Sequence, residues 1–432
     1  MGASPIVALS VLVVVLGLGV WVFAGLLSVG ISGLAFFTKV PIDRVLANAF
    51  WSTSTTPELL ALPLFIYMAE ILFRTRLSEM LLRGFTPWVA WLPGRLAHIN
   101  VLACTIFAAV CGSSAATTAT IGRITISELV GQGYDRRIII GSLAGAGTLG
   151  LLIPPSLVMI IYGVLAEVSI LKLFIAGFIP GFLLALAFMA LIAVISIINP
   201  SVVPKSQETY SWDDRIKSIP LLLPAFLLIG SVLSSMYSGI ASPTEAAVIG
   251  VIGAIAISGL TGTFSWENMK LASMRAVRTT SMIGLIVAGA TFLGISIGYL
   301  GIPRFIASEI TALNLGPYTL IAVLVVFYLI LGCVLEGMSA IVMTLPITLP
   351  LIEAAGFDKL WFGVFLVITI EMAQVTPPVG FNLFVIQGLT RDRIGRIFVY
   401  TLPFLGVMIG MAFLVAVFPE LVTYLPNQIS FR

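Results

Sequence analysis

The sequence predicts an all-α polytopic membrane protein with about ten transmembrane helices and two re-entrant hairpins, arranged as an inverted repeat. The first observation behind this prediction is composition. Of the 432 residues, 59% are hydrophobic and only 9% are charged, and the mean hydropathy is +1.14. Soluble domains carry about 25% charged residues, so a soluble enzyme, a disordered chain and a nucleic-acid-binding protein are excluded. The distribution of Lys and Arg and a repeated motif are the other two observations.

Apolar runs of about 20 residues, the length that crosses a bilayer, mark the expected spans. They lie near residues 5–23, 25–38, 58–73, 139–165, 173–198, 219–238, 243–260, 277–300, 360–388 and 397–418. The amphipathic stretch 77–93 is expected to be an interfacial helix. The polar stretch 199–218 is expected to be a cytoplasmic linker between a first half, 1–198, and a second half, 219–432.

Two further apolar segments, 96–130 and 317–351, contain clusters of Gly, Ser and Thr in their middle. Each could cross the membrane once or fold back as a re-entrant hairpin. Basic residues concentrate in cytoplasmic loops. With an outside N-terminus and two hairpins, most of the 22 Lys and Arg residues face the cytoplasm, whereas two single crossings turn the majority outward. The charge distribution favours a hairpin at 96–130. It does not decide between a hairpin and a single crossing at 317–351.

A repeated motif supports the second hairpin. The cluster Gly112–Ala115 is followed about 40 residues later by Pro154-Pro155, and Gly337–Ala340 is followed at a similar distance by Pro377-Pro378. Each half therefore combines a small-polar hairpin with a broken helix, 139–165 or 360–388. Because the hairpins enter from opposite sides, the halves are inverted, which is the recurring plan of secondary transporters.

Broken helices suit the binding of ions. Proline removes a backbone donor and interrupts the helix, and the freed carbonyls, together with nearby hydroxyls, can bind a cation. Helix N-termini beside them suit an anionic substrate. Close helix packing is the alternative explanation for the small-residue cluster, and a simple kink is the alternative for each double proline.

Polar residues in the apolar segments give further candidates. Glu336 directly precedes the second cluster and is a candidate for ion or proton coupling, or else a carboxylate at a helix end. Asn382 could face the substrate or bond another helix. Glu245 follows Ser242 and is expected to cap a helix. An enzyme is not expected, because a serine nucleophile would need a base and the single histidine, His98, lies at the far end of a hairpin arm.

At these residues the chain resembles the large membrane subunit of a tripartite ATP-independent periplasmic (TRAP) transporter. The matching motifs are Gly112–Gly122, Gly150–Ser156, Pro243–Ala247 and Thr376–Gly380, in similar order and spacing over nearly the full length. The resemblance implies sodium-coupled import of a small organic acid (a carboxylate) across a bacterial inner membrane by an elevator mechanism. It also implies two partners, a small four-helix membrane subunit and an extracytoplasmic substrate-binding protein.

The resemblance also implies two sodium sites and no other metal or cofactor. The first would use Ser113, Ser114, Gly150, Ile153 and Pro155, and the symmetry-related site would use Gly337, Ser339, Ala373, Thr376 and Pro378. Further candidates for substrate binding or coupling are Gly112, Thr117, Thr148, Ser156, Glu336 and Asn382. The N-terminus is expected on the periplasmic side. The rival hypothesis is a stand-alone ion- or proton-coupled carboxylate or anion transporter that needs no binding protein.

Overall fold

A computed structural model of the protein describes residues 20–204, 210–302, 305, 316–332, 335–378 and 380–428. The regular structure in these ranges is helical, which confirms the predicted all-α membrane fold. Six of the described helices are long and apolar enough to cross a membrane. A seventh span results if α3 and the segment that follows it, which are bent by 55° relative to each other, are counted as one.

The α-helices divide into a first and a second series along the chain. The first series is α2 (Val22–Phe37), α3 (Ile42–Ser54), α4 (Ala61–Leu72), α5 (Leu77–Val89), α6 (His98–Cys111), α7 (Ser114–Gly131), α8 (Arg136–Thr148), α9 (Leu157–Ala166) and α10 (Ile170–Ile198). The second is α11 (Trp212–Tyr237), α12 (Pro243–Leu260), α13 (Trp266–Tyr299), α15 (Pro317–Gly332), α16 (Gly337–Ala354), α17 (Lys359–Gln374), α18 (Phe381–Thr390), α19 (Ile394–Val417) and α20 (Glu420–Gln428).

Most predicted spans correspond to helices. One predicted span lies mostly outside the described residues, and two helices are present that the sequence does not predict. The span predicted at 5–23 lies mostly outside the described residues. The helices α3 and α20 were not predicted, because both are short and carry polar residues that interrupt any long apolar run. In α3 the buried residues Val45 and Ala49 lie on one face, and the helix packs on α13. Tertiary packing therefore stabilises a helix that apolar length does not reveal.

The first small-polar segment forms a hairpin. The helices α6 and α7 pack against each other, and the chain turns between them at Gly112, whose φ is +58°. Both ends of the hairpin lie together, since the backbone N–H of Leu96 donates to the Tyr134 hydroxyl at 3.1 Å. The left-handed backbone at the turn favours glycine.

The second small-polar segment has the same design. The Tyr328 hydroxyl of α15 bonds to Thr344 at 2.8 Å and to Thr348 at 3.0 Å, both on α16. The ends of this segment also meet, because the rings of Tyr318 and Phe357 lie 6.5 Å apart in an edge-to-face arrangement. The segment therefore enters and leaves at one end of the molecule, as expected of a hairpin.

The long helix α19 shows that the two hairpins open at opposite ends. At its N-terminal end, Asp392 pairs with Arg136, which directly follows the first hairpin, at 2.9 Å. At its C-terminal end, the carbonyl of Val415 accepts a 2.9 Å hydrogen bond from the Trp361 indole, just after the second hairpin. A helix of 24 residues separates its ends by about 36 Å. The halves are therefore inverted with respect to each other.

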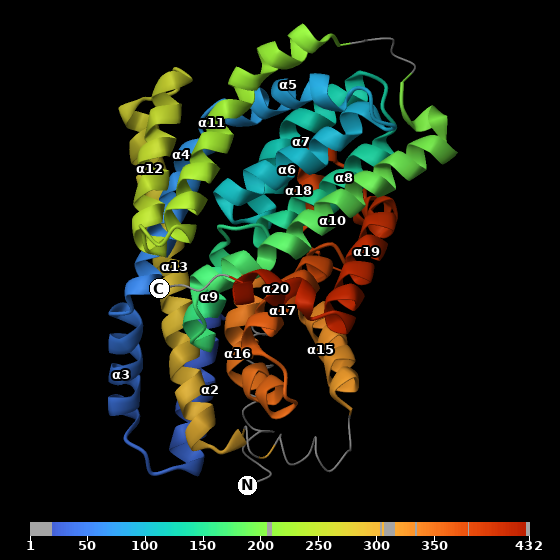
Figure 1. The fold of residues 1–432 in the computed structure, drawn as a ribbon. Helices are drawn as coiled ribbons and strands as arrows, with labels where there is room; N and C mark the ends of the chain where they lie inside the picture. Colours follow the sequence, from blue (N-terminus) through green and yellow to red (C-terminus); the bar gives the residue numbers. More distant parts are fainter. Residues whose placement is uncertain are drawn as a thin grey trace.

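The helices form two groups (Figure 1). In one group, α13 packs against α2, α3 and α4, and α12 packs against α4 and α11. The other group holds both hairpins and both broken helices, with α17 packed against α9, α10, α15, α16 and α19. The broken helices and the hairpin turns therefore lie inside one group, with the continuous helices of the other group along its side.

Packing of α8 on α19 predicts a large effect at Gly141. A Cβ added there would lie 2.2 Å from the carbonyl oxygen of Tyr400. Since a backbone oxygen cannot rotate away, Gly141→Ala must separate the helices, and overpacking of this kind costs about 1–3 kcal/mol. We expect a lower melting temperature for the detergent-purified variant. The control is Gly406→Ala on α19, whose added Cβ meets no atom within 4 Å; equal melting temperatures for the two variants would contradict this packing.

Candidate functional site

The turn of the first hairpin is inserted into the break between α8 and α9. A Cβ on Gly150 would lie 3.0 Å from the backbone carbonyl of Ser113 and 3.1 Å from the backbone nitrogen of Ser114. A Cβ on Gly112 would lie 3.1 Å from the carbonyl oxygen of Pro155. The two backbones therefore touch without intervening side chains. Four of the five residues predicted for the first ion site come together in this way.

The second half of the chain contributes to this same turn. The Asn382 side-chain amide, on α18, donates a 2.6 Å hydrogen bond to the Ser114 hydroxyl. Nearby on α7, Thr117 and Thr118 are fully buried, and Thr118 packs against Gly147 of α8. The Asn382 carbonyl oxygen and both threonine hydroxyls have no hydrogen-bonding partner in the described part of the chain. Such buried atoms are costly, so the cluster favours a bound polar ligand.

The turn of the second hairpin packs against both broken helices. A Cβ on Gly337 would lie 2.4 Å from the Gln374 amide nitrogen of α17 and 3.5 Å from the side chain of Leu151 in the first break. Gly332, at the end of α15, contacts Ala373 in the same way. The structure therefore brings Gly337 and Ala373 to one place. It also joins the second turn to the first break, so both hairpin turns and both breaks form one cluster.

Several candidate hydroxyls have local structural partners. Ser156 caps α9, donating to the Leu151 carbonyl at 2.5 Å and accepting from the Met159 N–H at 3.3 Å. Thr148 donates back to the Gly145 carbonyl at 2.8 Å, and Thr376 donates back to Met372 at 2.7 Å. A hydroxyl oxygen carries two lone pairs, so donation of its hydrogen to the helix does not by itself prevent it from binding a cation. These contacts do not exclude ion binding by the hydroxyls, and they give each hydroxyl a structural role.

The remaining candidates lie at the edges of the cluster. The side chain of Ile153 packs toward Gly181 on α10, so this residue could offer an ion only its backbone carbonyl. Pro378 is exposed, and Ser339 is half-buried in the first turn of α16. The backbone N–H of Ser339 donates to the Glu336 carboxylate at 3.4 Å.

The acidic residues are mostly explained by helix ends and ion pairs. Glu336 caps α16, accepting from the backbone N–H groups of Met338 at 3.1 Å and Ser339 at 3.4 Å. Glu245 forms a capping box with Ser242 at the start of α12, as expected. Glu70 pairs with Arg74 at 2.8 Å. The structural alternative for Glu336 therefore has direct support, because its carboxylate stabilises the helix whose N-terminus it caps.

A cavity of about 580 Å³ separates the first hairpin from the other helix group. One wall is the face of α7 that carries Ala116, Ala119, Thr120 and Arg123, and the opposite wall comes from α4, α5 and α13. Arg74 and Arg275 add two more guanidinium groups to this cavity. In the sequence these arginines indicate only topology, and their convergence on one cavity is not predicted. The signal in the sequence that could have indicated this cavity is the presence of arginines close to the small-polar segment.

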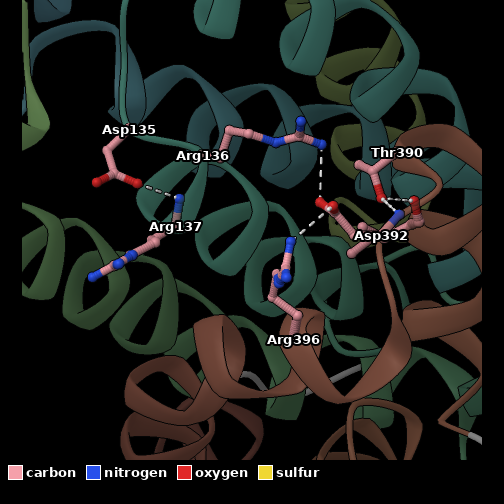
Figure 2. Close-up of polar contacts among 7 residues, drawn as sticks. Asp135, Arg136, Arg137, Thr390, Asp392 and Arg396 are labelled. Atoms are coloured by element: carbon pink, nitrogen blue, oxygen red, sulfur yellow. Dashed lines mark hydrogen bonds and ion pairs between the residues drawn. The ribbon is translucent and has the colours of Figure 1, made fainter.

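A polar contact joins the two halves near the cavity's end of the molecule. Figure 2 shows Asp392, which follows α18, facing Arg136 of α8 and Arg396 of α19. The Arg136 pair is 2.9 Å long and the Arg396 pair is 4.0 Å long. The Arg136 side chain is 47% exposed, so this pair contributes at most about 1 kcal/mol to stability. The pair connects the loops of the two halves at this point.

Comparison with known proteins gives consistent matches. The family model described as "Tripartite ATP-independent periplasmic transporter, DctM component" matches residues 9–421. The C4-dicarboxylate TRAP transporter large permease proteins DctM of Vibrio cholerae and Pseudomonas aeruginosa are 31% and 33% identical to this chain. Each alignment covers 93% of this chain, and they cover 93% and 94% of the relatives.

A solved structure with the same overall fold is the Alcanivorax borkumensis YdaH transporter. Its TM-score is 0.60, and the match covers 90% of this chain and 89% of that one at 14% sequence identity. This similarity concerns the fold alone.

Proposed function

Since the chain belongs to the DctM component family of tripartite ATP-independent periplasmic transporters, we propose that it is a sodium-coupled importer of a small organic acid. The observation that carries this proposal is the single cluster formed by two hairpin turns and two broken helices. The Asn382–Ser114 hydrogen bond joins residues of the two halves, and Gly337 lies near Gln374 and near Leu151 of the first break. The backbone carbonyls and hydroxyls of the cluster can bind a cation without a charged side chain.

In this proposal sodium binds at the two sites implied by the resemblance, Ser113–Ser114 with the first break and Gly337–Ser339 with the second. Each ion would join a hairpin turn to a helix break, so ion binding closes the hairpins on the substrate. The hairpin group would then move as one body past the group built on α12 and α13, as in an elevator. The separation into two helix groups supports this mechanism (Figure 1).

The substrate is proposed to be a carboxylate. The related proteins of Vibrio cholerae and Pseudomonas aeruginosa are named for C4-dicarboxylates. The cavity beside α7 has a volume typical of small-molecule sites. It presents Arg123 and Arg275, together with Glu79 and with Arg74, which pairs with Glu70 at 2.8 Å. Guanidinium groups pair with carboxylates through two parallel hydrogen bonds. We therefore assign this cavity to the path of an organic anion toward or from the hairpin turn.

The family description implies two further components. We propose that a small membrane subunit and an extracytoplasmic binding protein work with this chain in a bacterial inner membrane, with its N-terminus on the periplasmic side. The rival, a stand-alone transporter, would not need either partner. Co-purification with a four-helix membrane subunit supports the tripartite proposal, and full uptake by the isolated chain would favour the rival.

Sodium binding is expected to raise the melting temperature of the detergent-purified protein above its value in potassium at equal ionic strength. A ligand specific for the folded state adds about 2.7 kcal/mol at a hundredfold excess over its Kd. Ser114→Ala and Thr376→Ala each remove one predicted ligand and should reduce this sodium-specific rise. Ser127→Ala is a matched control, because the exposed Ser127 hydroxyl donates to the Arg123 and Ile124 carbonyls of its own helix.

Transport completes the test. The chain is reconstituted with its two partners, and uptake of labelled succinate, the simplest C4-dicarboxylate probe, is followed with and without an inward sodium gradient. Uptake that depends on the gradient supports the proposal. A wild-type protein that shows neither a sodium-specific melting shift nor sodium-driven uptake would overturn the sodium coupling.

A further inference from the structure

Two guanidinium groups in the cavity beside α7 lie outside the ion pairs found in the described part of the chain. Arg123 and Arg275 both line this cavity, and both residues are exposed. Neither belongs to any of those ion pairs. The third arginine of the cavity, Arg74, differs because it pairs with Glu70 at 2.8 Å. Arg123 and Arg275 are therefore available to an anion that enters the cavity.

The acidic residues of the cavity do not offset both of these charges. Besides Glu70, the lining contains the carboxylate of Glu79 on α5, which forms no ion pair with any residue that the structure describes. The lining thus holds three arginines against two glutamates and has a net positive charge. A cleft with one sign of charge raises the local concentration of ions of the opposite sign.

The two arginines lie on different helix groups. Arg123 is on α7 of the first hairpin, and Arg275 is in the first third of α13. The helix α13 packs against α2, α3 and α4, whereas α7 packs against α6, α8 and α18. In the mechanism proposed above, the hairpin group moves past the group built on α12 and α13. A ligand bound to both arginines would therefore join the moving group to the stationary one.

This pair of arginines is separate from the ion cluster at the hairpin turns. Arg123 shares one face of α7 with Ala116, Ala119 and Thr120, which line the cavity with it. It follows Ser114 by nine residues, which corresponds to about 14 Å along a helix. The pair is therefore a second position for an anion, away from the turn that is proposed to bind sodium.

The proposed orientation places the cavity on the cytoplasmic side. Arg74 and Arg76 closely follow α4, and Arg136 follows the first hairpin. The positive-inside rule assigns such basic segments to the cytoplasm. The cavity is bordered by Arg74 of the first segment and by the hairpin itself. An anion can therefore reach it from the cytoplasm, where an imported substrate accumulates.

We propose that Arg123 and Arg275 bind the two ends of a cytoplasmic dicarboxylate, and that this bridge holds the hairpin group in place and slows further import. A guanidinium binds a carboxylate through two parallel hydrogen bonds, so each arginine takes one end of the dianion. The bridge forms only where both arginines reach the same ligand, so the ligand raises the population of that conformation. The proposal rests on the transport function above, because it concerns the regulation of that transport.

The number of carboxylates decides which anions can act in this way. A monocarboxylate can pair with either arginine, but it connects nothing across the cavity. Succinate and butyrate have carbon chains of equal length and differ in one carboxylate, so they separate bridging from simple pairing. The competing explanation is attraction of any anion to basic residues near the membrane surface. Arg278 tests it, because it is an exposed arginine on α13 that does not line the cavity.

The first test measures binding without transport. The detergent-purified full-length protein is melted in potassium buffer without sodium, so that the proposed sodium sites stay empty. Succinate should raise the melting temperature, and butyrate at equal ionic strength should not. Arg275→Gln and Arg123→Gln should each remove most of the rise, whereas Arg278→Gln should keep it. A wild type without any rise, equal rises for the two acids, or a full rise in Arg275→Gln and Arg123→Gln overturns the proposal.

The second test measures regulation in the reconstituted complex. The binding protein delivers labelled succinate from outside, so only molecules whose cytoplasmic side faces the lumen are read. The lumen contains unlabelled succinate or butyrate and no sodium, which prevents sodium-coupled loading of the transport site from within. Luminal succinate should slow the initial uptake by about fivefold, within the usual range of coupling between two sites. Luminal butyrate should leave the uptake unchanged.

The variants show whether this inhibition acts through the two arginines. Each variant is compared with its own uptake into an empty lumen, because Arg123 and Arg275 also line the proposed substrate path. Arg275→Gln should raise the luminal succinate concentration for half-inhibition by about tenfold, since it removes a hydrogen-bonded charge pair. Arg123→Gln should do the same, and Arg278→Gln should be inhibited like the wild type. Wild-type inhibition of Arg275→Gln and Arg123→Gln overturns the inference.

The inference and the proposed function fail in different ways. Sodium-driven uptake that luminal succinate does not slow overturns this inference and leaves the proposed function intact. A complex without sodium-driven uptake overturns the proposed function, and the regulation falls with it.

Discussion

Gly150→Ala is expected to reduce sodium-dependent uptake by about tenfold or more, because displacing a binding geometry by a fraction of an ångström has effects of this size. The added Cβ would lie 3.0 Å from the backbone carbon and oxygen of Ser113. Backbone atoms cannot rotate out of the way, so the hairpin turn must move away from the break. The carbonyl and hydroxyl groups proposed to share one sodium ion would then separate. Uptake by the reconstituted complex and the sodium-specific melting shift measure this effect.

The control for this variant is Gly388→Ala on α18, where an added Cβ meets no atom within 4 Å. Alanine is favoured over glycine in a helix by about 0.5–1 kcal/mol, so the control should be at least as stable as wild type and should transport normally. A Gly150→Ala protein with the wild-type response to sodium would mean that this contact is not part of an ion site.

Asn382→Ala should impair transport even though the residue lies far along the chain from the first hairpin. The substitution removes the 2.6 Å hydrogen bond to Ser114 and leaves a buried hydroxyl without that partner, which costs about 1–3 kcal/mol. The hairpin turn would lose its hydrogen bond to α18 while α7 still packs against that helix. We expect a lower melting temperature and a loss of most sodium-driven uptake, measured on the same preparations.

Asn268→Ala is the matched control, since its amide also donates one hydrogen bond, at 2.9 Å to the Thr263 carbonyl, but near a helix end far from the cluster. It should leave uptake unchanged. The double variant Ser114→Ala with Asn382→Ala tests the pair directly, because residues in contact give non-additive effects. Strictly additive losses would show that the two side chains act independently.

The sequence predicts the helical class, the two hairpins and most long helices, because each depends on local apolar length and on small-residue clusters. It does not predict α3, whose stability comes from packing Val45 and Ala49 near α13. Nor does apolar length reveal that α13 begins as early as Trp266, since its first turns carry Glu267 and Lys270. Such helix boundaries depend on tertiary contacts, and these contacts cannot be predicted from a single sequence.

The candidate site is likewise predicted only where it depends on local motifs. The resemblance names Gly150 and Gly337 as sodium-site candidates and Gly112 as a candidate for substrate binding or coupling, and in the structure each of them lies close to backbone or side-chain atoms of another element. The partner of Ser114 could not be predicted, because Asn382 lies 268 residues away and its amide had two equally reasonable roles.

The Asn382–Ser114 hydrogen bond makes the two halves of the inverted repeat unequal. Aligning the double prolines of the two halves pairs Asn382 with Met159, a thioether that packs against Gly177 and cannot donate a hydrogen bond to a hairpin turn. The turn of the first hairpin is thus hydrogen-bonded to the opposite half, and the first half offers the second hairpin no matching donor at the equivalent residue. The inverted repeat is therefore symmetric in its arrangement of helices but asymmetric in the hydrogen bonds that attach its hairpin turns to the opposite halves.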